Sequence, residues 1–183
     1  MMATSALYEL WSSLLHYPVG EDCALLPHRI QVLQEAAPDI AEHLQPLADY
    51  AESHTDSELE EVFTRTFDSN AERALEVGWH LHGENYARGV FMVRMRKMLR
   101  DVDVPESSEL PDHLSHILHV LARGKPAVAG ALATGVVSPA LAKIAEGFSN
   151  QKNPYFGVIS ALKQFIDTEH QNPQSPKEVP CHE

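Results

Sequence analysis

The sequence of 183 residues is poor in cysteine, glycine and basic side chains. It has two cysteines and nine glycines. It contains 14 lysines and arginines and 26 aspartates and glutamates, which gives a formal net charge of −12. Two cysteines exclude a small fold built on disulfides, and Cys23 and Cys181 are expected to be reduced thiols. The charge argues against nucleic acid as a partner, because affinity for phosphate backbones comes mainly from Lys and Arg.

Long apolar runs and a secretory leader are also missing. No stretch approaches the roughly 18 uninterrupted apolar residues of a membrane-spanning helix. The start, Met1 to Ala6, lacks the basic and apolar regions of a signal peptide. We therefore expect a cytoplasmic protein without stable membrane insertion.

The apolar residues make up 44% of the chain and are rich in Leu and Ala, which favours helices over strands. Their repeated i, i+3, i+4 spacing predicts an all-α, single-domain bundle of about eight helices over residues 1–170. Residues 171–183 contain three prolines and no apolar period, so we expect a disordered tail there.

Capping residues and prolines mark the expected helix starts. These starts are the caps Thr4 and Ser5, the prolines Pro27, Pro38, Pro111, Pro126, Pro139 and Pro154, the capping box of Ser57 with Glu60, and Asn85. The helix that follows Ser57 is expected to end near Asp68. Residues 101–108 are expected to form a linker.

Charge is distributed unevenly along the chain. Residues 1–76 hold 15 acidic and 3 basic residues, whereas residues 77–183 hold 11 of each. The acidic cluster is Glu52, Asp56, Glu58, Glu60 and Glu61, and the basic run is Arg88, Arg94, Arg96, Lys97 and Arg100. Two interpretations stay open: these are solvated helix faces, or the acidic surface steers a basic ligand toward the protein.

Eleven histidines raise the question of a metal or acid–base site. His113, His116 and His119 are three apart, and steps of about 300° spread them over more than about 100° of a helix surface, too widely for one ion. No H-E-x-x-H, C-x-x-C or phosphate-binding glycine loop occurs. We expect no catalytic residues, metal or cofactor, and a His-dependent metal hydrolase is kept as the less favoured alternative.

The segment Glu109-Leu110-Pro111-Asp112-His113-Leu114 allows two interpretations. It has the composition of a helix start, with proline in the first turn and acidic residues near the positive end of the helix dipole. The same composition places an Asp and a titratable His beside free backbone N–H groups, which suits a polar recognition corner.

Several short motifs occur in an order that resembles a known family. They are Leu14-Leu15-His16-Tyr17-Pro18, Thr66-Phe67-Asp68, His80-Leu81-His82-Gly83-Glu84 followed by Arg88-Gly89 and Met92, Leu110-Pro111-Asp112-His113-Leu114, and Asn153-Pro154-Tyr155. Together they resemble the NarJ-type (nitrate reductase delta subunit) chaperones of the TorD/DmsD superfamily. The chain has Asn85-Tyr86 where that family's pattern has Ser-Arg.

The resemblance implies an all-helical chaperone, without catalytic residues, that binds the N-terminal segment of an apo molybdoenzyme catalytic subunit. Cofactor insertion would follow, before membrane targeting or export, and proteins of molybdenum cofactor biosynthesis are further expected partners. The client could be a nitrate, selenate, chlorate, dimethyl sulfide or hydrocarbon enzyme. A helical scaffold for another protein is the other alternative. The expected client-binding residues are Glu109, Leu110, Pro111, Asp112 and His113, together with His82, Gly83, Arg88 and Gly89.

Overall fold

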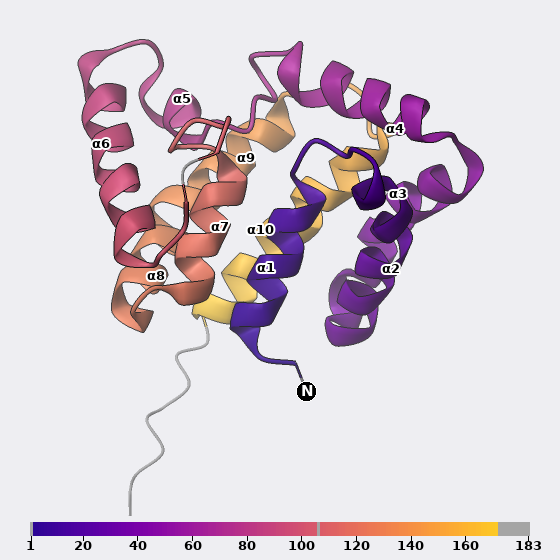
Figure 1. Cartoon of the computed structure of the whole chain (residues 1–183), viewed down its shortest axis with the longest axis horizontal. Helices are drawn as coiled ribbons and strands as arrows, with labels where there is room; N and C mark the ends of the chain where they lie inside the picture. Colours follow the sequence, from indigo (N-terminus) through magenta and orange to yellow (C-terminus); the bar gives the residue numbers. More distant parts are fainter. Residues whose placement is uncertain (1, 106, 172–183) are drawn as a thin grey trace, which may run out of the picture.

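The computed structural model describes residues 2–105 and 107–171 (Figure 1). Within these ranges the chain forms nine helices and no strand, so the expected all-α single-domain bundle is confirmed. The helical segments are α1 (Thr4–Leu14), α2 (Glu21–Ala36), η1 (Pro38–Ile40) leading into α3 (Ala41–Ser53), α4 (Asp56–Phe63) continued by η2 (Thr64–Asp68), α5 (Val77–His82), α6 (Tyr86–Asp101), α7 (Leu114–Arg123), α8 (Pro126–Leu132) continued by η3 (Ala133–Val137) and α9 (Ser138–Glu146), and α10 (Pro154–Gln171).

Helices α1 and α10 form the middle of the bundle (Figure 1). α10 packs against α3 and α9, while α1 packs against α7 and α2. The crossing of α10 with α3 is close, because a Cβ on Gly157 would overlap the carbonyl oxygen of His43. Trp11 of α1 and Tyr155 of α10 are among the largest fully buried side chains. The core therefore runs through the centre of the bundle and joins its two ends.

The acidic cluster and the basic run lie at opposite ends of the long axis (Figure 1). The acidic cluster covers the end of α3 and the whole of α4, and the basic run follows α6, the outermost helix at the other end. α6 contributes only two fully buried side chains, Met95 and Leu99. The uneven charge of the sequence is thus also a separation of charge in space.

Several predicted helix boundaries are confirmed. Asn85 caps α6, with its Oδ1 accepting a hydrogen bond from Ala87 N (2.7 Å), and Asn153 caps α10 by accepting one from Tyr155 N (2.9 Å). Pro38 opens η1 and Pro126 opens α8. The helix that includes α4 and η2 ends at Asp68, as expected.

The predicted helix start at Pro27 is wrong. Pro27 lies inside α2, which begins six residues earlier, because the buried stripe of Cys23, Leu26, Ile30 and Leu33 outweighs the penalty of an interior proline. Pro139 lies in the first turn of α9, as predicted. α9 continues directly from the π-helical turn η3, so one helix runs through Pro126–Glu146.

Two predicted caps and the predicted helix start at Pro111 are also wrong. Thr4 does not cap α1 with its side chain, because its Oγ1 donates to Glu169 Oε2 (2.9 Å) in α10. The capping box of α4 is Thr55 with Glu58, two residues before Ser57 and Glu60. The two overlapping patterns, T-x-x-E and S-x-x-E, explain this shift of two residues at the start of α4. Helix α7 starts at Leu114 with His113 as its cap, so Pro111 precedes the helix.

By length and composition alone, the helix over Pro126–Glu146 could cross a membrane. An apolar 18-residue window of this helix is 39% buried inside the protein. One such helix is weak evidence for a membrane span, because core helices meet the same criterion.

Cys23 is a buried free thiol, whereas Cys181 lies outside the described residues. So does most of the predicted tail, although Gln171 is still helical.

Candidate functional site

A tight turn over residues 110–113 leads from the linker into α7. His113 N donates to Leu110 O (3.0 Å), which closes the turn. Two further backbone hydrogen bonds attach it to the segment before α5: Val77 N donates to Asp112 O and Leu114 N donates to Leu75 O, both at 2.8 Å. This isolated antiparallel bridge between Glu76 and His113 holds the turn against the start of α5.

Asp112 is completely buried and forms an ion pair with Arg88 of α6. Its Oδ2 accepts a hydrogen bond from Arg88 Nε at 3.0 Å, and Oδ1 has no partner among the described residues. Gly78 makes room for this carboxylate, because a Cβ there would lie 2.5 Å from Oδ2. The Arg88 guanidinium also lies 5.9 Å from the centre of the Trp79 ring. Asp112 therefore fixes Arg88 beside Trp79.

His113 is neutral and caps α7. Its Nδ1 accepts a hydrogen bond from Ser115 N (3.3 Å) and lies 2.7 Å from Ser115 Oγ. Burial is the main reason that the pKa of His113 falls to about 3, and the nearby His116 and His16 add to this effect. Its other nitrogen, Nε2, lies 3.9 Å from Glu109 Oε2. Asp112 and His113 thus have separate partners.

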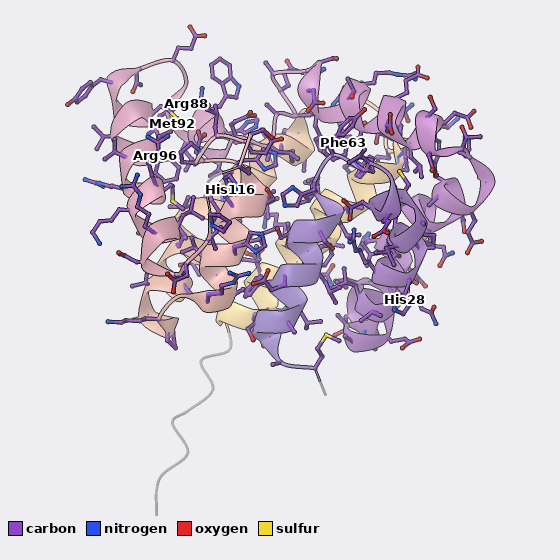
Figure 2. All side chains as sticks on the ribbon, viewed as in Figure 1. His28, Phe63, Arg88, Met92, Arg96 and His116 are labelled. Atoms are coloured by element: carbon purple, nitrogen blue, oxygen red, sulfur yellow. The ribbon has the colours of Figure 1, made fainter. Side chains whose placement is uncertain are left out.

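The other two histidines of α7 point to different elements. His116 lies with Nδ1 2.9 Å from Leu110 O and Nε2 2.9 Å from Ser107 Oγ, so it attaches the linker to the helix. His119 pairs with Glu9 and Ser12 of α1. Figure 2 shows His116 near the start of α7, with Arg88 and Arg96 along α6. Among the described residues no group of three or more His, Cys, Asp or Glu could hold a metal ion.

A hollow of about 530 Å³, here called the corner hollow, opens at this turn. It is lined by Phe67, Asp68, Ser69, Asn70, Ala71, Ala74, Leu75, Glu76, Trp79, Arg88, Glu109, Leu110 and His113. Its lining has three carboxylates, Asp68, Glu76 and Glu109, against the single permanent cation Arg88. Burial raises the pKa of Asp68 and of Glu76, and the Asp112 charge raises that of Glu76 further. The corner hollow suits a ligand with basic and apolar groups.

Two of the short motifs support one wall of this hollow. Asn153 Nδ2 donates to Thr66 Oγ1 at 2.8 Å, and the rings of Phe67 and Tyr155 meet edge to face with centres 5.1 Å apart. Arg73 adds a hydrogen bond from Nε to Thr66 O at 2.9 Å. The start of α10 therefore anchors the Thr66-Phe67-Asp68 segment, from which Phe67 and Asp68 line the hollow.

Residues 33–168 of the chain match the nitrate reductase delta subunit family. The chain belongs to this family. The matched range includes every residue of the corner hollow and most of the bundle. No curated protein matches the chain. Membership of the delta subunit family implies a role in nitrate reductase assembly rather than catalysis.

The structure brings some of the expected site residues of this delta subunit family member together. Arg88, Glu109, Leu110 and His113 line the corner hollow, with Pro111 and Asp112 buried in the turn behind it.

Three others lie apart from the corner hollow. Gly83 lines a neighbouring hollow and ends α5 with a φ of 61°, a conformation that favours glycine. His82 lines neither hollow, and its ring centre lies 5.6 Å from that of Phe91. Gly89 is an ordinary helical residue of α6, and a Cβ there would meet nothing.

Sequence reasoning missed Asp68, Glu76 and Trp79 as lining residues. Asp68 is the last residue of the Thr66-Phe67-Asp68 motif, and Trp79 directly precedes the His80-to-Glu84 motif, so their positions next to these motifs could have indicated them as site residues. Nothing in the sequence around Glu76 indicates a site residue. Its position depends on the backbone bridge to His113, 37 residues away in the sequence.

Proposed function

We propose that this protein is a cytoplasmic chaperone for the catalytic subunit of a nitrate reductase-like molybdoenzyme. It binds the N-terminal segment of the apo subunit and holds it until the molybdopterin-guanine-dinucleotide cofactor is inserted, before membrane targeting or export. Proteins of molybdenum cofactor biosynthesis are further proposed partners. Family membership supports this role, and the observation that carries the binding site is the acidic and partly apolar corner hollow.

The client segment enters the corner hollow with apolar and basic side chains. Leu110 is 45% exposed at the rim, and covering it together with the Trp79 ring contributes roughly 25 cal/mol per Å² of apolar surface buried. Glu76 is partly buried and forms no ion pair among the described residues, and burial raises its pKa although the Arg88 charge acts in the other direction. A basic client side chain would stabilise its charged form and lower that pKa again.

The remaining expected site residues position these contacts. Asp112 and Pro111 hold the turn, and Asp112 orients Arg88, whose guanidinium donates to carbonyl oxygens of the client. His82 and Gly83 shape the turn before α6, where Asn85 Nδ2 donates to His82 O at 2.6 Å. Gly89 leaves the first turns of α6 open for the bound segment.

Copurification of the apo catalytic subunit with the tagged protein tests this function. Leu110→Ser should strongly reduce the amount of subunit captured and lower molybdoenzyme activity in cells, without changing the melting temperature. Val93→Ser is the matched control, because Val93 is 68% exposed on α6 and lines neither hollow. The proposal fails if the wild-type protein captures no apo subunit, or if both variants capture as much as the wild type.

A further inference from the structure

A second hollow of about 640 Å³ lies beside the corner hollow, and three contacts build its frame. Trp79 Nε1 donates to Ala71 O at 2.9 Å, which joins α5 to the loop after η2. Lys143 Nζ donates to His80 O at 2.7 Å, which joins α9 to α5. Gly147 closes the frame, because a Cβ there would overlap the carbonyl oxygen of Glu72. The second hollow is therefore a built feature of three segments rather than a gap between loose loops.

The electrostatics of the second hollow favour a cation. Glu72 and Glu146 line it as exposed carboxylates, and neither side chain has an ion-pair partner among the described residues. The helix over Pro126–Glu146 ends here, so its carbonyl end adds partial negative charge. The one lining lysine, Lys143, is held by the His80 carbonyl. Burial lowers the pKa of His80, which keeps that side chain neutral.

Trp79 and Ala71 line both hollows, so the indole and its hydrogen bond to Ala71 form the partition between them. A chain that follows the surface from the corner hollow over the Trp79 ring reaches the second hollow next. Both hollows have more carboxylates than permanent cations in their linings: Asp68, Glu76 and Glu109 against Arg88 in one, and Glu72 and Glu146 against Lys143 in the other.

We propose that the second hollow is a further subsite for the same client segment and takes a basic side chain. The recognised segment then carries basic residues on both sides of an apolar residue, with the apolar residue on the Trp79 indole and one basic side chain in each hollow. This inference rests on the proposed function and specifies the chemistry of the client segment.

Calorimetric titration of the full chain with synthetic peptides tests the subsite. One peptide series carries an apolar residue with a lysine on one side only, and the matched series carries a lysine on each side at several spacings. The best two-lysine peptide should bind the wild-type protein about fivefold more tightly at low salt, the gain of one well-placed exposed ion pair, and high salt should reduce the difference.

The double variant Glu72→Gln, Glu146→Gln should remove this preference and leave binding of the one-lysine peptide unchanged. Both positions are exposed, so the variant should fold normally. Glu35→Gln with Glu42→Gln is the matched control, since it makes the same change in net charge on α2 and α3. Equal binding of the two peptide series by the wild type, or a preference that survives in the double variant, would overturn the subsite.

The same double variant separates the subsite from the proposed function. If wild-type protein captures the apo catalytic subunit and the double variant captures it equally well in a competitive assay, the subsite is wrong and the chaperone function stands. If the wild type captures no apo subunit at all, the proposed function is wrong and the subsite falls with it.

Discussion

Replacing Arg88 by Met removes the only described partner of a buried carboxylate. Asp112 is 0% exposed and Arg88 is 19% exposed, and their contact is 3.0 Å. In the Arg88→Met variant both Asp112 oxygens lack a donor. Removing one member of a buried ion pair costs about 3–5 kcal/mol, and we expect about 3 kcal/mol here because Arg88 is partly solvated. Chemical denaturation at neutral pH measures this loss in the free energy of unfolding.

The double variant Arg88→Met, Asp112→Asn completes the test. It removes the buried charge itself and should regain most of the lost stability at neutral pH. Asp112→Asn alone should cost less than Arg88→Met, because the Arg88 side chain can still reach solvent. A cost below about 0.5 kcal/mol for Arg88→Met would refute the buried-pair argument, since that is the range of ordinary surface substitutions.

Two further predictions concern stability. The pKa of His113 is about 3 in the folded protein, against its ordinary value of 6.5 in the unfolded chain. Below about pH 6.5 the unfolded chain therefore binds a proton that the folded protein does not, and this group should lower the free energy of unfolding by up to about 1.4 kcal/mol per pH unit. His113→Asn keeps a capping side chain and should flatten the pH profile of the melting temperature; an unchanged slope would contradict this. Gly157→Ala should destabilise by about 2 kcal/mol or more, because its Cβ overlaps His43 O, whereas Gly89→Ala should stabilise by up to about 1 kcal/mol. Equal melting temperatures for the two glycine variants would count against the close α3–α10 crossing.

Local chemistry explains the boundaries that could be predicted from the sequence. Asn85 and Asn153 cap their helices with hydrogen bonds to residues two positions ahead, so the whole interaction lies within a few residues. Pro27 could not be placed correctly in this way. It lies inside α2, where burial of an apolar stripe overrides the local preference of proline.

The candidate site was predictable only in part for the same reason. The turn at Leu110 and Pro111 could be recognised as unusual, and Arg88 stood in a motif. That Asp112 pairs with Arg88 and not with His113 depends on the packing of α6 against α5 and α7, and on the space left by Gly78. Glu76 enters the site through a backbone bridge, a contact that side-chain patterns do not encode.

Site-specific photocross-linking in cells tests the central claim most directly. A photoreactive amino acid is placed at Leu110, at the rim of the corner hollow, or at Val93, which is exposed on α6 and lines neither hollow. We predict that the apo catalytic subunit cross-links through its N-terminal segment to position 110 and not to position 93. Cross-linking of that subunit at position 93 and not at position 110 would contradict it.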